Sequence, residues 1–396
     1  MRHPLNTHVP RLVLALSLAL LSACGGGGGG GDPAPATAAP ASSAPGSTAG
    51  VPAGTSAASA LAARLGKPNR FLVGLGTGSS PASIQAQGLK PDIYDVYLVG
   101  VGAGAWPEWN SPSGDYVNRH AERADQMGAV PMFTLYQMAS NGDGNLAGLA
   151  DAQFMARYWA NVRLMFQRIA MFGKPVLVTV EPDFWGYVQR QSPGGDPRRT
   201  AAQVSVDADC AGQPNDVTGV AGCIFQMARK YAPKAAVGLM PSAWGANTAG
   251  EVATFMQAVG AQRGDFVAME TLDRDAGCFE ARGAECTRAG SGWYWDETAF
   301  RNHLSLARTL HQALGLPLIW WQTPLGVPSD SAGGAPGRYR DNRVQLFLTR
   351  TAELAAVGGL GAVFSTGAAG QTTVDSDGGQ FQRLSRSYLA SPVPLP

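Results

Sequence analysis

Eight short apolar segments, rich in β-branched and aromatic residues, recur along the chain with helical patterns between most of them. They span residues 70–76, 95–102, 130–136, 175–181, 235–241, 265–271, 316–322 and 361–366. Eight alternations of strand and helix without a hairpin signal predict a parallel sheet, and we expect one α/β domain, a (β/α)8 TIM-like barrel. An open doubly wound sheet is the alternative. It would often carry a phosphate-binding glycine turn after the first strand, but the glycines of 74–80 are followed by a poor helix pattern.

The clearest helical pattern lies at 149–173, where apolar side chains recur at helical spacing and Gly173 follows. Further helices are expected at 298–315 and 342–359. Each of these segments separates two of the apolar runs, as a parallel barrel requires.

The amino terminus indicates export. Residues 1–23 have a basic start and an apolar run too short to span a membrane. They end in "LSAC", Leu21 to Cys24, which resembles a bacterial lipobox and implies a signal peptide cleaved before Cys24 and lipidation of Cys24. Because Gly25 stands where an inner-membrane retention aspartate would be, the resemblance implies a lipid anchor in the outer membrane or at the cell surface of a Gram-negative bacterium. An ordinary secretory signal with a chance cysteine is the alternative.

Residues 24–60 contain seven consecutive glycines followed by Ala, Pro, Ser and Thr, so we expect a flexible tether and a folded barrel over 61–396. The chain has 30 Lys and Arg against 29 Asp and Glu and no basic run, which gives no reason to expect a nucleic-acid partner.

Four cysteines follow Cys24 and form two local pairs in an exported chain. The simplest of three connectivities joins Cys210 to Cys223 and Cys278 to Cys286. Two free thiol pairs or a zinc site are the alternatives, although neither pair has a histidine nearby.

Histidine is scarce where a barrel places its chemistry. Functional groups lie on loops after the carboxyl ends of the strands, but His120, His303 and His311 all fall in expected helices. A Ser-His-Asp triad or a histidine-rich metal site would need a histidine at a strand end. We therefore expect no metal and no cofactor, and what remains is carboxylates among aromatic residues.

Carboxylates follow two of the predicted strands. Glu181 and Asp183 come after the fourth, and Glu270 and Asp273 after the sixth. Paired carboxylates suit hydrolysis of an acetal, because one protonates the leaving oxygen while another acts as nucleophile or activates water. If the chain stays extended through Pro182, alternation points Glu181 and Asp183 to one face, and Glu181 and Glu270 could converge across the barrel mouth. Salt bridges to the loop arginines are the alternative: Arg190, Arg274 or Arg338.

Aromatic and amide side chains at the strand ends suit a sugar, whose C–H faces pack on rings while its hydroxyls bind polar groups. We expect ring subsites at four tryptophans: Trp185, Trp244, Trp293 and Trp320. Packing in the core is the alternative for Trp320. Hydroxyl-binding groups are expected at Tyr136, Gln137, Asn141 and Gln322.

The segment "LVTVEPDFWGYVQ" is similar to a strand and turn of glycosyl hydrolase family 6, the cellulases, in which a Glu-Pro-Asp segment follows a strand and its aspartate is the general acid. The resemblance implies that Asp183 is the proton donor, whereas barrel geometry permits Glu181. Gln137 stands where the family has an aspartate, and "GLMPSAWG" lacks the family's Asp-Ala-Gly-His run.

The leading hypothesis is a lipid-anchored glycoside hydrolase that cleaves a cell-surface or extracellular polysaccharide or oligosaccharide. A barrel that binds glycan without turnover, or serves envelope assembly, is the alternative. A metal-dependent phosphodiesterase or deacetylase using Asp143, Glu181 and Asp183 is a third hypothesis, although such enzymes usually recruit histidine.

Overall fold

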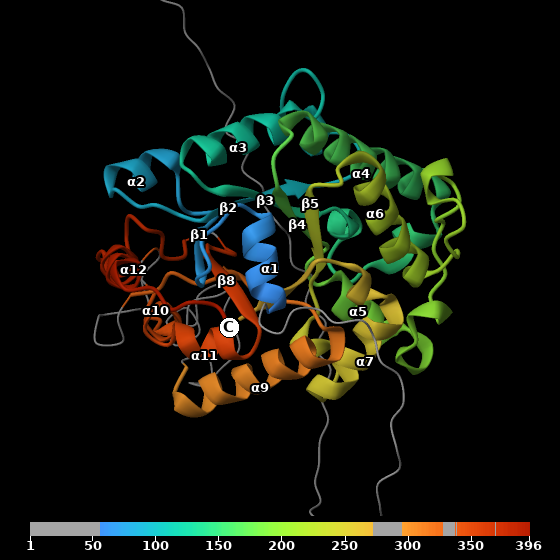
Figure 1. Cartoon of the computed structure of the whole chain (residues 1–396). Coiled ribbons are helices and arrows are strands. Elements are labelled where there is room, and N and C mark those ends of the chain that lie inside the picture. The colour runs from blue at the N-terminus through green and yellow to red at the C-terminus, as the bar shows by residue number, and fades with distance from the viewer. Residues whose placement is uncertain (1–55, 272–294, 328–336, 338, 369) are drawn as a thin grey trace, which may run out of the picture. The chain divides into compact units, whose positions relative to one another are not determined.

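The computed structural model describes residues 56–271, 295–327, 337, 339–368 and 370–396. Eight parallel strands close into a barrel in sequence order, so the predicted (β/α)8 fold is confirmed (Figure 1). The strands are β1 (Leu72–Leu75), β2 (Ile93–Val99), β3 (Val130–Tyr136), β4 (Val176–Val180), β5 (Ala235–Leu239), β6 (Phe266–Glu270), β7 (Leu318–Thr323) and β8 (Gly359–Phe364). Each overlaps one of the eight apolar segments.

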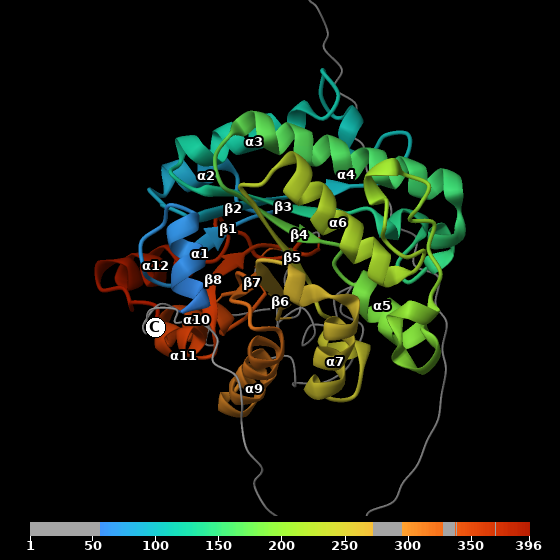
Figure 2. The same ribbon diagram turned by 45° about the vertical axis from the view of Figure 1, so that its right-hand side comes forward.

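Helices surround the barrel. The described ones that follow β1 are α2 (Pro81–Ala86), α3 (Asp115–Gln126), α4 (Ala152–Phe172), α5 (Phe184–Gln191), α6 (Val217–Tyr231), α7 (Ala249–Val259), α9 (Glu297–Leu314), α10 (Arg343–Thr349), α11 (Thr351–Ala356) and α12 (Gln380–Ala390). Figure 2 shows α3, α4 and α6 side by side against the outside of the strands. The helix expected over 342–359 is divided into α10 and α11 by Arg350, whose backbone is not helical.

The long helix α4 shows how local sequence sets an element. Its N-cap Asp151 accepts hydrogen bonds from the backbone amides of Gln153 and Phe154, and Gly173 ends it in a left-handed conformation. Its apolar stripe is buried against the barrel, as the spacing predicts.

Helix α1 (Ala57–Arg64) crosses the amino-terminal end of the barrel. Arg64 pairs with Asp265, just before β6, and Lys67 donates a hydrogen bond to the carbonyl of Gly128, just before β3. Because β3 and β6 are three places apart in the ring of eight strands, the segment carrying these residues reaches across that opening. The last four residues of the expected tether, 57–60, belong to this helix.

One predicted disulfide falls on described residues. Cys210 and Cys223 are bonded, which joins the turn before α6 to that helix. Cys278 and Cys286 lie outside the described residues. Among the described helices, none is long and apolar enough to cross a membrane.

Candidate functional site

The turn after β4 has an unusual backbone. Glu181 and Asp183 have φ values of 56° and 64°, and Gln322 near the carboxyl end of β7 has 49°. Such values are costly for residues with a β-carbon, and strain of this kind is concentrated at functional sites. The chain therefore does not stay extended through Pro182, and simple alternation does not decide where the two carboxylates point.

Glu181 points into the protein and is fully buried. Its Oε2 accepts hydrogen bonds from the backbone amides of Gln137 at 3.0 Å and Met138 at 2.9 Å. Burial raises the pKa of Glu181 to about 7, although these amides and the Tyr158 hydroxyl favour the ionised form. Glu181 was expected to converge with Glu270 across the barrel mouth, but its side chain is fully buried and joins two turns through hydrogen bonds.

Asp183 lies beside a second carboxylate and two tyrosines. The Tyr136 hydroxyl donates a hydrogen bond to Asp143. Burial raises the pKa of Tyr136, and the charges of Asp143 and Asp183 raise it further. Burial raises the pKa of Tyr187, and the charges of the same two aspartates raise it further. Asp143, Asp183 and Tyr187 also line one small cavity. We call Tyr136, Asp143, Asp183 and Tyr187 the acidic cluster.

Trp244, in the turn after β5, borders the acidic cluster. Its ring meets that of Tyr187 edge-on at 4.8 Å between centroids, and the Arg190 guanidinium lies 4.9 Å from its ring centroid. A β-carbon at Gly186 would come within 2.8 Å of Trp244, so this contact depends on a glycine in α5. Because Trp244 is partly exposed, its placement fits the expected ring subsite.

Three expected ligand-binding side chains are fully buried. The Trp185 indole donates to the carbonyl of Val180, and the Trp320 indole donates to His303 Nε2 at 2.7 Å. Gln137 Oε1 accepts a hydrogen bond from Asn161 Nδ2 at 2.7 Å. All three side chains are covered by protein, and this burial favours a packing role over the expected sugar binding. The alternative of a core position for Trp320 is the one that the structure favours.

The remaining predicted residues lie at the strand ends in different settings. Gln322 is 4% exposed and donates to the carbonyl of Thr366, whereas Asn141 is exposed. Glu270 is partly exposed, and its Oε1 accepts a hydrogen bond from the amide of Ala243, next to Trp244. Asp273 and Trp293 lie outside the described residues.

A polar group inside the barrel escaped the sequence analysis. The Trp321 indole of β7 donates to Thr134 of β3 at 2.8 Å, and these strands are not neighbours, so the contact crosses the interior. The Thr134 hydroxyl in turn binds Asp95 of β2, whose pKa burial raises to about 7. Asp95 was predicted only as the first residue of a strand. A charged residue beginning an otherwise apolar run is the signal that could have identified it.

The three histidines lie in helices, as expected: His120 in α3, and His303 and His311 in α9. Within the described ranges, no group of three or more His, Cys, Asp or Glu side chains is arranged to hold a metal ion.

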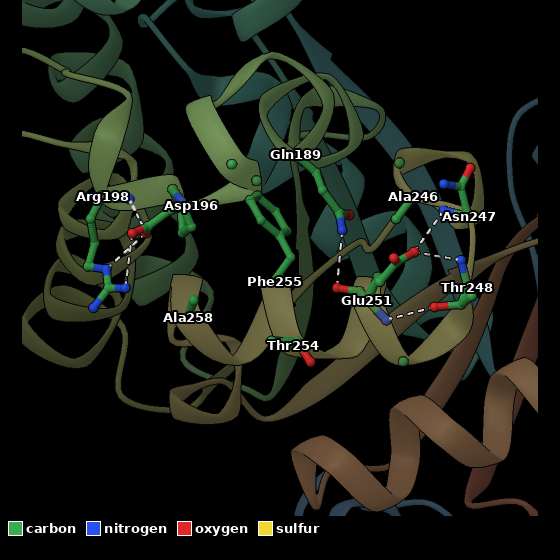
Figure 3. Close-up of a pocket in the computed structure, with 15 residues that line it drawn as sticks. Gln189, Asp196, Arg198, Ala246, Asn247, Thr248, Glu251, Thr254, Phe255 and Ala258 are labelled. Atoms are coloured by element: carbon green, nitrogen blue, oxygen red, sulfur yellow. Dashed lines mark hydrogen bonds and ion pairs between the residues drawn. The ribbon is translucent and has the colours of Figure 1, made fainter.

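Figure 3 shows another cavity, of about 720 Å³, between α7 and the segment from α5 to Arg198. Its polar side chains mostly bind one another: Gln189 donates to the carbonyl of Glu251, the Glu251 carboxylate caps α7, and Arg198 pairs with Asp196 (Figure 3). Among its described lining residues, none belongs to the acidic cluster. These internal bonds leave few polar groups there for a ligand.

No family model and no curated protein matches the chain. Among solved structures, the chain is similar to the endoglucanase Cel6 from Mycobacterium tuberculosis, with 16% identity over 60% of this chain and 64% of that one and a TM-score of 0.34. It is also similar to a hyperthermophilic endo-β-1,4-glucanase, with 11% identity over 82% of this chain and 99% of that one and a TM-score of 0.44. A third similar structure is D-allulose 3-epimerase from Methylomonas sp., with 13% identity over 81% of this chain and 98% of that one and a TM-score of 0.42. The chain thus spans less than two thirds of the Cel6 chain. At these identities and TM-scores, the likenesses say nothing about activity or substrate.

Proposed function

We propose that the protein is a glycoside hydrolase that cleaves a polysaccharide, with Asp183 as proton donor. The observation that carries this proposal is the acidic cluster, in which Asp183, Asp143 and Tyr187 line one cavity and Tyr136 donates a hydrogen bond to Asp143. Two carboxyl groups at the carboxyl-terminal mouth of a barrel are what hydrolysis of a glycosidic bond requires. This pairing replaces Glu181 with Asp143, because Glu181 is buried beneath the cluster.

The proposed reaction divides the work between the two aspartates. Asp183 protonates the glycosidic oxygen as the bond to the anomeric carbon breaks, and water then adds to that carbon and releases a proton, which restores the acid form of Asp183. Asp143 accepts a hydrogen bond from Tyr136, which fixes its position, and in the proposed reaction it stabilises the positive charge that develops on the sugar ring. Glu270, near Trp244, is the alternative second carboxylate.

Aromatic rings beside the cluster would bind the sugar. Trp244 is partly exposed and held between Tyr187 and Arg190, so its ring is positioned before a ligand arrives. A sugar ring that stacks on it would lie beside the cluster that contains Asp183.

The test is reducing-end release from a panel of polysaccharides by Asp183→Asn and Asp143→Asn. Each substitution should lower kcat by roughly 10²- to 10⁴-fold, the usual contribution of acid or base catalysis. Asp125→Asn is the matched control, because Asp125 pairs with Lys174 on the surface. Wild-type rates in Asp183→Asn would overturn the assignment. Saturable glycan binding without turnover by the wild-type chain would favour the non-catalytic alternative.

Attachment to the membrane through Cys24 is part of the proposal and rests on the lipobox resemblance alone. Labelled fatty acid should enter the wild-type chain in a bacterial host and should not enter Cys24→Ser. Equal labelling of both chains would contradict it.

A further inference from the structure

We propose that a second part of the barrel mouth binds a short neutral segment of the same polysaccharide, an inference that rests on the proposed hydrolase function. A cavity of about 590 Å³ opens between the turn after β1, strand β2 and the start of α3. We call it the mouth cavity; its lining residues include Gly76, Ser79, Asp95, Tyr97, Trp109 and Tyr116. Its volume falls in the range of about 300–1,000 Å³ that small-molecule sites occupy.

Tyr97 connects the mouth cavity to the acidic cluster. Its side chain lines the cavity, and its ring centroid lies 6.2 Å from that of Tyr136. Tyr136 binds Asp143 in the cluster. The two regions therefore meet at the adjacent rings of Tyr97 and Tyr136, and in the proposal one extended sugar chain passes over both rings.

Trp109 offers the mouth cavity an exposed ring. It is 41% exposed, which is unusual for so large an apolar side chain. Its indole donates to the carbonyl of Gly104 at 3.0 Å, and its ring meets Tyr116 edge-on at 5.1 Å. The ring is therefore held in place before binding, and a platform of this kind loses little entropy when a sugar stacks on it.

Ser79 supplies an unused polar group. The residue is 3% exposed, and its hydroxyl has no hydrogen-bond partner within the described part of the chain. The backbone of Ser79 is fixed, because its amide donates a hydrogen bond to the carbonyl of Gly76 and its carbonyl accepts one from the Tyr94 hydroxyl. The Ser79 oxygen is covered in the unbound chain, and binding of a sugar hydroxyl would give it the partner that buried hydroxyls normally have.

The charge of the lining selects the kind of sugar. The described lining contains two carboxyl side chains, Asp95 and Asp375, and no Lys or Arg. The positive charge of Arg123 works against the rise that burial causes in the pKa of Tyr94 and Tyr116, but Arg123 is not among the described lining residues. A lining without Lys or Arg offers no cation to pair with a uronate or a sulfated sugar, whereas the hydroxyls of an uncharged sugar can bind its polar groups.

The binding test uses the full-length chain with Asp183→Asn, so that no sugar is consumed, and calorimetric titration. The probes are cellotetraose, laminaritetraose and maltotetraose as neutral sugars, and tetragalacturonate as the anionic one. At least one neutral sugar should bind, and tetragalacturonate should not. Added Trp109→Ala should weaken binding roughly tenfold or more, which is the loss of one stacking contact, and added Ser79→Ala should weaken it severalfold.

Two controls separate binding from folding. Trp109→Phe keeps an aromatic ring and should retain most of the affinity, whereas Met171→Ala, at a residue 69% exposed on α4, should leave the affinity unchanged. Unchanged affinity in both Trp109→Ala and Ser79→Ala would overturn the proposal, as would tetragalacturonate binding as tightly as the neutral sugars.

The proposed hydrolase function can fail separately. A wild-type chain that binds neutral sugars through Trp109 but releases no reducing ends overturns the hydrolase and supports the mouth cavity. If the wild-type chain hydrolyses polysaccharide and the Trp109→Ala variant has the same KM, the proposal for the mouth cavity is overturned and the hydrolase function stands.

Discussion

The carboxyl group of Glu181 and the backbone amide of Met138 are hydrogen-bonded at 2.9 Å. Glu181 begins the turn that carries Asp183, and Met138 begins the turn that leads to Asp143. A buried carboxyl group thus holds in register the two turns that bear the acidic cluster. Its part in the proposed reaction is positioning, because it does not reach the mouth.

Glu181→Gln should change how stability depends on pH. Burial raises the pKa of Glu181 from 4.5 to about 7, so the folded state binds more protons between these values. The stability contributed by the protonated group is present below pH 4.5 and is lost as pH rises through about 7, by on the order of 3 kcal/mol. Glutamine does not ionise, so the variant should gain stability relative to wild type from pH 5 to pH 8. Urea unfolding at both pH values measures this, and a constant difference would contradict it.

Glu181→Ala is the contrasting variant. It leaves the amides of Gln137 and Met138 buried without an acceptor, at a cost of about 1–3 kcal/mol for each unsatisfied group. Destabilisation at both pH 5 and pH 8 is expected, together with lower kcat. Glu181→Gln keeps an acceptor oxygen and should restore much of the kcat, whereas Glu181→Met, of similar volume but without an acceptor oxygen for the amides, should lose stability and kcat as alanine does.

Tyr136→Phe should lower kcat if Asp143 acts as proposed. The substitution removes the hydroxyl that donates to Asp143. A hydrogen bond to a charged group contributes about 1.5–3 kcal/mol, so kcat should fall roughly 10- to 100-fold. Tyr231→Phe makes the same chemical change at a hydroxyl that binds Asp209 away from the cluster, and its kcat should match wild type. Steady-state kinetics that show equal losses in both variants would contradict the role of Tyr136.

The two tryptophans near the turn after β4 should behave differently when replaced. Trp244→Ala removes a partly exposed ring and should raise KM severalfold with a small change in melting temperature. Trp185→Ala empties a fully buried site and should destabilise the fold by about 3–5 kcal/mol. Kinetics and thermal unfolding on both variants check this, and a large stability loss in Trp244→Ala would assign that residue to packing too.

The barrel could be predicted because its evidence is local. Each strand is a short apolar run, and repetition of strand and helix implies parallel pairing regardless of which side chains meet. The disulfide between Cys210 and Cys223 followed in the same way, from two cysteines 13 residues apart in a chain whose amino terminus predicts export.

The site was harder to predict because it depends on contacts between distant residues. Proximity in sequence suggested that Glu181 and Asp183 act together, but the left-handed backbone at both residues separates them, and Glu181 binds amides 44 and 43 residues away. The sequence shows tryptophan at a strand end, yet burial of Trp185 and Trp320 depends on which helices cover them. The pairing of Asp183 with Asp143 likewise requires knowing how two turns meet.

The buried ion pair of Arg343 and Asp341 supports a further prediction about the rim of the barrel. Both side chains are fully buried, and Arg343 also donates to the carbonyl of Thr271, directly after β6 and Glu270. Arg343→Met should destabilise the fold by about 3–5 kcal/mol, because it removes the guanidinium that pairs with the buried Asp341 carboxylate.

Two variants test that explanation of the loss in Arg343→Met. Asp341→Asn added to Arg343→Met should recover part of the stability, because it removes the buried negative charge of the Asp341 carboxylate. Arg119→Met, which breaks an exposed pair with Asp115, should cost less than about 1 kcal/mol. Urea unfolding of the three chains measures these differences. A double variant less stable than Arg343→Met would show that the stability loss comes from the missing hydrogen bond to Thr271 rather than from the charge of the Asp341 carboxylate.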